Sequence, residues 1–180
     1  MFFTCRESFD ADDGDRWTNY LRWLGRADLA RVVTLDGMLC PPLIHLETHP
    51  AWEHAVSDNF TTGDLYTDLD LILGGSRTYP RRMVLAALRE PSAEDFAGFQ
   101  LLDFEFAGFD LFDRMCYASA LLNCGGFPDV FSIEELSPRT GLLASRERAY
   151  QVRDDLRMLH PDEPHADCHV WALWRYVETT

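Results

Sequence analysis

Residues 169–176, His-Val-Trp-Ala-Leu-Trp-Arg-Tyr, constrain the fold of this chain more than any other segment. Successive side chains of a strand point to opposite faces of a sheet. In this segment bulky residues occupy both sets of alternating positions, so neither face of the strand is suited to water. We therefore predict an interior strand over 169–176.

A helix is predicted over 146–159, because apolar residues recur there at helical spacing and Ser145 stands at the N-cap position. A second helix is predicted over 65–73, ended by Gly74 and Gly75. Four further strands are predicted, at 31–35, 83–88, 100–106 and 117–122. The evidence for them is apolar–polar alternation, β-branched residues or a short apolar run. Gly108 is a candidate for a bulge beyond the third of these.

These elements indicate one α+β domain over residues 1–180, with a mixed or antiparallel sheet and helices packed on one side. The 180 residues are 47% hydrophobic, which suffices for a core without disulfides or a structural metal. No repeat or Ser/Gly-rich linker divides the chain, and no strand–helix turn has a phosphate-binding glycine pattern.

Composition predicts a cytoplasmic, bacterial protein. No apolar run approaches the length of a membrane span, and the first residues do not resemble a secretory signal. The five cysteines are odd in number, widely spaced and without a C-x-x-C motif, as in proteins with reduced thiols. All sixteen basic residues are arginine, and the absence of lysine favours a high-GC bacterial genome.

The net charge of −14 argues against binding to nucleic acids or anionic membranes and favours a basic protein partner. The excess lies in residues 90–138, where ten acids and one arginine leave a charge of −9. We expect the partner-binding residues in this segment: Glu94, Asp95, Asp103, Glu105, Asp110 and Asp113.

The segment 100–106 makes this expectation specific. Alternation predicts that Leu102, Phe104 and Phe106 face the core. Asp103 and Glu105 then lie on the opposite face, where burial without partners would cost several kcal/mol. We therefore expect that face to be open to water and to contribute to a docking surface.

In size, acidity and lack of catalytic motifs the chain resembles bacterial immunity proteins that neutralise a cognate toxin. The resemblance rests on no motif, so it assigns no functional residue. It implies a cytoplasmic, protein-binding inhibitor with an acidic surface. That is our leading hypothesis, with no catalytic residue and no cofactor assigned.

Residues 160–169 support a second hypothesis, a metal-dependent hydrolase or oxygenase, because they contain three histidines, a cysteine and three carboxylates. If residues 165–169 are extended, His165 and Asp167 project from one face about 7 Å apart, as metal ligands can. A third ligand would have to come from elsewhere, and an ordinary loop leading into a strand is the alternative interpretation.

His45 and His49 form another histidine pair, although Pro50 disfavours a helix there. A scaffold or assembly subunit is the third hypothesis, which predicts a large apolar patch and a dimer.

Overall fold

The computed structural model describes residues 1–8, 22, 29, 31–45, 64–113, 118–123 and 126–177. The prediction for His49 lies outside these residues. The described residues form a four-stranded sheet with three α-helices, which confirms the α+β fold class. Every strand pair is antiparallel, so the sheet is antiparallel rather than mixed.

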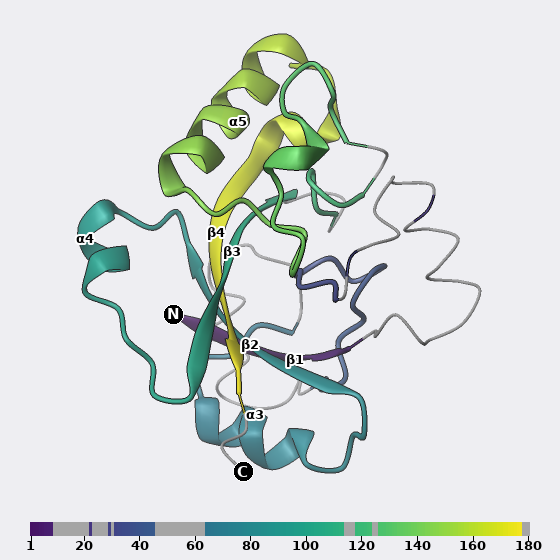
Figure 1. Cartoon of the computed structure of the whole chain (residues 1–180). Coiled ribbons are helices and arrows are strands. Elements are labelled where there is room, and N and C mark those ends of the chain that lie inside the picture. Colours follow the sequence, from purple (N-terminus) through teal and green to yellow (C-terminus); the bar gives the residue numbers. More distant parts are fainter. Residues whose placement is uncertain are drawn as a thin grey trace.

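The strand order is β1-β2-β4-β3, which places the last strand of the chain inside the sheet (Figure 1). The strands are β1 Phe2–Glu7, β2 Arg82–Arg89, β3 Phe104–Asp113 and β4 Cys168–Tyr176. The interior position of β4 confirms the prediction for 169–176, and β2 confirms the buried strand at 83–88. From Val170 to Trp174 every β4 side chain is buried, as expected for a strand covered on both faces.

Helix α5 spans Arg146–Leu159, the range that the sequence predicts. The Ser145 hydroxyl accepts a hydrogen bond from the backbone N–H of Arg148 and so caps the first turn. Ala149, Val152 and Leu156 are buried, forming the apolar stripe by which the helix packs near β3 and β4. In Figure 1 α5 lies beside the end of the sheet where β4 begins.

Ser145→Ala is expected to lower the free energy of unfolding by about 1 kcal/mol, because one N–H of the first turn loses its acceptor. Urea denaturation measures this difference. Gln151→Ala, at an exposed position in the middle of α5, is the control and should be neutral or slightly stabilising. An equal loss in both variants would mean that helix propensity, and not the cap, governs the stability of this helix.

Helix α3 spans Leu69–Ser76, so it starts and ends later than predicted. Asp68 is its N-cap and accepts a hydrogen bond from Leu71 N, which fixes the first turn. Tyr66 pairs with Phe3 beside β1 and therefore lies outside the helix. The short helix α4, Ala93–Ala97, begins with a capping box between Ser92 and Asp95.

Strand β3 starts at Phe104 and not near residue 100. Leu102 and Asp103 form a turn, and Asp103 has a φ of 65° that breaks the expected alternation. The prediction that Leu102 and Phe106 face the core is wrong: their side chains are 88% and 39% exposed. Gly108 does mark a register shift against β4, as expected for a bulge.

Two predicted strands are wrong. Residues 32–35 contain no regular strand, and 118–122 are mainly turn. In both places a side chain binds neighbouring backbone N–H groups: the Asp36 carboxylate accepts from residues 38 and 39, and the Ser119 hydroxyl accepts from residues 121 and 122. Such local bonds favour turns over a strand ladder.

In the described part of the chain, no helix is long and apolar enough to cross a membrane.

Candidate functional site

The acids of residues 90–138 are less concentrated in space than in sequence. Arginines of the C-terminal third pair with several of them, at N–O distances of 2.5 Å for Arg148–Glu135, 2.8 Å for Arg153–Glu90 and 4.0 Å for Arg175–Glu105. The first pair is bidentate, since Arg148 also donates to the second oxygen of Glu135 at 3.0 Å. The local charge of −9 therefore overstates the field that a partner would meet.

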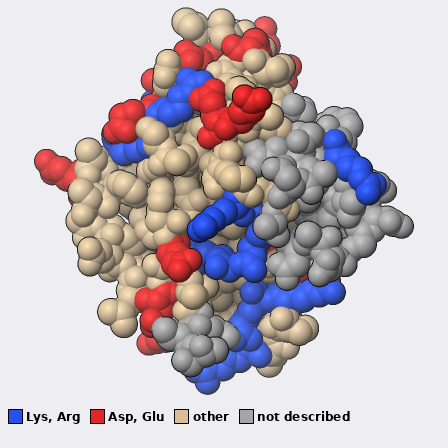
Figure 2. All heavy atoms as spheres, in the orientation of Figure 1, with Lys and Arg blue, Asp and Glu red and all other residues tan. Residues whose placement is uncertain are grey.

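Exposed acids and exposed apolar side chains both occur on α4 and in the chain that leads into β3. We define the α4–β3 surface as Glu94, Asp95, Leu102, Asp103 and Phe106. Leu102 and Phe106 are 88% and 39% exposed. In Figure 2 the molecular surface over α4 and the start of β3, at the left of the view, is mainly uncharged with acidic side chains among it. The sequence has no basic residue between Arg89 and Arg114.

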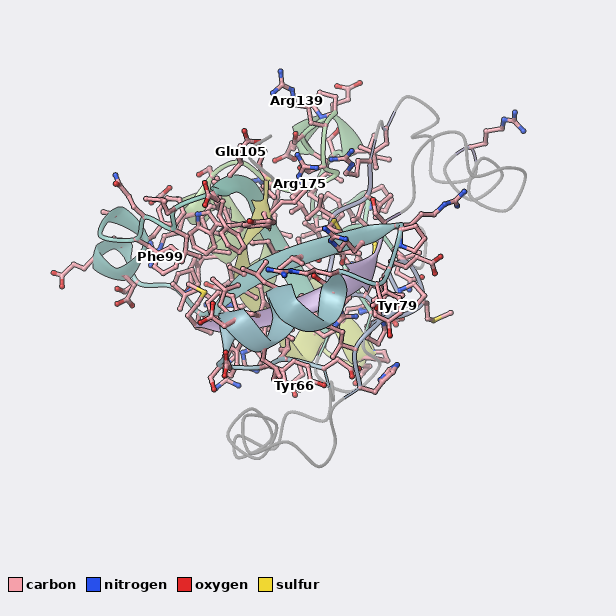
Figure 3. All side chains as sticks on the ribbon, turned by 90° about the horizontal axis from the view of Figure 1, so that it is seen from below. Tyr66, Tyr79, Phe99, Glu105, Arg139 and Arg175 are labelled. Atoms are coloured by element: carbon pink, nitrogen blue, oxygen red, sulfur yellow. The ribbon has the colours of Figure 1, made fainter. Side chains whose placement is uncertain are left out.

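Aromatic contacts hold α4 and the start of β3 together. The Phe96 ring lies 5.0 Å from Phe106 and 6.0 Å from Trp174, and the Phe99 ring lies 4.7 Å from Trp174. Phe99, labelled in Figure 3, is thus packed against β4. This cluster packs α4 and the chain that follows it against Phe106 of β3 and Trp174 of β4.

The predicted partner-binding acids occupy three different environments. Glu94 and Asp95 are exposed on α4, and Asp103 is exposed in the turn before β3. Glu105 is also exposed, but it lies on the opposite face of the sheet from Phe106 and across from Arg175 (Figure 3). The expected exposure of Asp103 and Glu105 is therefore confirmed, and Arg175 of β4 offsets part of the charge of Glu105.

Asp110 does not belong to the surface. Its side chain is 0% exposed and accepts hydrogen bonds from Thr34 and Ser119, so its prediction as a partner-binding residue is wrong. Asp110 follows the bulge on β3, and its side chain contacts Thr34 in the segment 31–44. Composition alone does not reveal this tertiary contact. Asp113 ends β3, and the prediction for its side chain lies outside the described residues.

The predicted metal ligands lie in a 3₁₀ helix, η2 (Pro164–Asp167), and not in an extended segment. His165 is buried, with its ring 5.6 Å from that of Phe127, whereas Asp167 is exposed. The expected extended geometry of this pair is therefore wrong. Within the described residues, no group of three or more His, Cys, Asp or Glu side chains is arranged to hold a metal ion.

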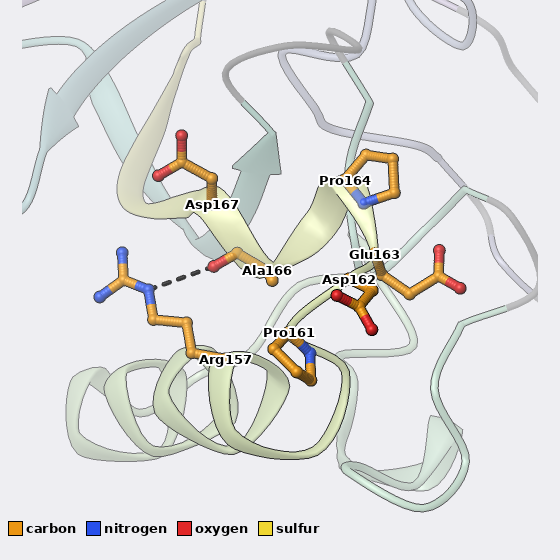
Figure 4. A pocket seen from close by; sticks show the side chains of 7 residues that line it. All are labelled: Arg157, Pro161, Asp162, Glu163, Pro164, Ala166 and Asp167. Carbon is orange, nitrogen blue, oxygen red and sulfur yellow. Dashed lines mark hydrogen bonds between the residues drawn. The ribbon is translucent and has the colours of Figure 1, made fainter.

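An open pocket of about 610 Å³ lies between η2 and the end of α5 (Figure 4). Prolines 161 and 164 line it together with the carboxylates of Asp162, Glu163 and Asp167. Arg157 is bound to the carbonyl oxygens of Ala166 and Cys168, which ties η2 to the helix.

A polar cluster surrounds Glu90, which has a φ of 48°. Its carboxylate accepts hydrogen bonds from His169, from Val170 N and from Arg153. Burial acts to raise the pKa of Glu90, but these hydrogen bonds and the charge of Arg153 leave it below its usual value. Arg153 also lies over the ring of Tyr150. The cluster ties α5 to the end of β2 and is structural.

No protein-family model matches this chain, and no match was found among curated proteins or solved structures.

Proposed function

We propose that this protein is a protein-binding inhibitor that docks on a basic partner through the α4–β3 surface. The observation that carries the proposal is the exposure of Leu102 and Phe106 beside Glu94, Asp95 and Asp103. Large exposed apolar side chains with a polar rim are typical of interaction sites. The ring contacts of Phe106 with Phe96 and Trp174 limit the conformational entropy that this side chain loses on binding.

The acids around this surface define the chemistry of the partner. Arginine and lysine side chains of a partner would meet carboxylates there, and no basic residue of this segment competes with them. Charge complementarity of this kind mainly accelerates association and fixes orientation. A toxin with a cationic active site has the required surface, so neutralisation of such a toxin is the specific form of the proposal.

Charge reversal on the α4–β3 surface tests this function. Glu94→Arg combined with Asp103→Asn changes the charge by three units and keeps a residue that tolerates the positive φ of Asp103. We expect association with a basic partner to slow by roughly tenfold at low salt and to lose much of its salt dependence. Affinity capture from the native host, followed by stopped-flow binding, measures both.

A matched control separates location from total charge. Asp162→Asn combined with Glu163→Arg makes the same change of three units at exposed positions beside the η2 pocket. This variant should capture the same partner as the wild-type protein and bind it nearly as fast. Equal losses in both variants would indicate a non-specific charge effect. Failure of the wild-type protein to capture any basic protein at low salt would contradict the proposal.

A further inference from the structure

A pair of carboxyl groups lies in the core, independent of the α4–β3 surface. Asp36 and Asp110 are both 0% exposed. Asp36 accepts four hydrogen bonds, from Met38 N and Leu39 N to Oδ1 and from Ser119 N and Asn123 Nδ2 to Oδ2, at 2.8–3.1 Å. All four are N–H donors, an environment suited to an ionised carboxylate, which only accepts hydrogen bonds.

Asp110 has a different environment, because hydroxyl groups face its carboxyl oxygens. Thr34 Oγ1 donates to Oδ2 at 2.5 Å and Ser119 Oγ donates to Oδ1 at 2.6 Å. A hydroxyl group rotates to donate to a carboxylate or to accept from a carboxylic acid. Thr34 Oγ1 accepts one N–H, from Asp36, and has a second lone pair that can accept a proton carried by Oδ2 of Asp110. The site therefore accommodates Asp110 with or without a proton, whereas a proton on Asp36 would face an N–H donor.

The charges around this pair also favour one proton. Asp36 faces Asp110 from the segment 31–44, and so does Cys40, whose pKa burial raises to about 12 so that the thiol is neutral. Arg6 on β1 is 2% exposed and bonds to the carbonyl of Cys40, and its charge acts on Asp36. The residues facing Asp110 from 118–123 and β4, Ser119 and Trp171, are neutral. The charge of Arg6 is shared between Asp64 and Asp36.

We propose that Asp110 takes up and releases a proton in the folded protein and that this proton stabilises the contact of β3 with residues 31–44 and 118–123. Burial raises the pKa of Asp110 to about 6, against the hydrogen bonds of Ser119 and Thr34, which lower it. The pKa of the unfolded chain is lower, so the folded state holds the proton more tightly. This contribution to stability is complete below about pH 4 and is lost as the pH rises through about 6.

Asp110→Asn is the first test, since it replaces the titrating group with a neutral one of the same shape. The unfolding constant of the wild-type protein, divided by that of the variant, is expected to rise by up to about 100-fold between pH 4 and pH 7.5. Urea denaturation at intervals of half a pH unit gives this ratio. Groups other than Asp110 titrate in both proteins and cancel. A ratio that does not change with pH would overturn the proposal.

Titration of the wild-type protein, followed by carboxyl ¹³C NMR, is the second test. It does not depend on the folding of Asp110→Asn. One buried aspartate signal should have a midpoint near pH 6, as the raised pKa of Asp110 requires. Ser119→Ala removes a donor to the ionised form and should move this midpoint upward. Titration of every aspartate near pH 4, or a midpoint that Ser119→Ala does not move, would contradict the assignment.

Discussion

Gly108→Ala is expected to lower the free energy of unfolding by about 3–5 kcal/mol, the combined cost of backbone strain and overpacking. Gly108 has a φ of 139°, which side-chain-bearing residues rarely adopt. A Cβ atom there would lie 2.6 Å from Leu142 Cβ and 3.0 Å from the Leu143 carbonyl oxygen. Because Leu143 pairs with Phe109 through backbone hydrogen bonds, that carbonyl has little freedom to move away.

Gly74→Ala is the matched control for Gly108→Ala, measured by the same urea denaturation. Gly74 lies in α3, and a Cβ atom at this position would meet nothing within 4 Å. Alanine should therefore stabilise the helix by roughly 0.5–1 kcal/mol. Equal stability of the two variants would contradict the close packing of the β3 bulge against residues 142 and 143.

Asp36→Asn is expected to destabilise the protein by about 3 kcal/mol or more, although it preserves the shape of the side chain. Each oxygen of Asp36 accepts two N–H donors. An asparagine oxygen would accept one pair, while its NH₂ group would face the other pair, leaving buried donors without acceptors. Thermal and urea denaturation at pH 7 measure the loss.

Asp110→Asn provides the contrast within the same cluster. Thr34 Oγ1 accepts one N–H, from Asp36, and after rotating can accept from an asparagine NH₂ group, while Ser119 keeps donating to the asparagine oxygen. This variant should therefore remain folded at pH 7. The two substitutions remove the same charge from equally buried positions. Similar losses of stability in both would mean that the buried charge itself, and not the arrangement of donors, determines the effect.

The sequence predicts the elements whose signals are local. Helix α5 has both an N-cap and a regular apolar stripe, and β4 has bulky residues on both faces. The sequence therefore predicts the bounds of both elements to within one residue. The apolar and β-branched content of the segments around Thr34 and Ser119 predicts strands that the structure does not have. Their polar side chains instead bind nearby backbone groups and form turns, a competition that hydrophobic patterns do not measure.

The candidate site was predicted only in part because its properties depend on tertiary contacts. Exposure of Glu94, Asp95, Asp103 and Glu105 follows from their polarity, and the structure has them exposed. The burial of Asp110 depends on two hydroxyl donors from distant segments. The exposure of Leu102 depends on the backbone conformation of Asp103, which ends the alternation one residue before β3. Neither is encoded in the local pattern of residues 100–113.

Amide hydrogen exchange of the wild-type protein, alone and with its captured basic partner, tests the central proposal most directly. We expect slower exchange on binding in residues 92–106, which carry the α4–β3 surface, because a docked partner excludes water from this surface. Residues 157–167 beside the η2 pocket should exchange at the same rate in both states. Protection at the η2 pocket, with residues 92–106 unchanged, would contradict the proposed docking surface.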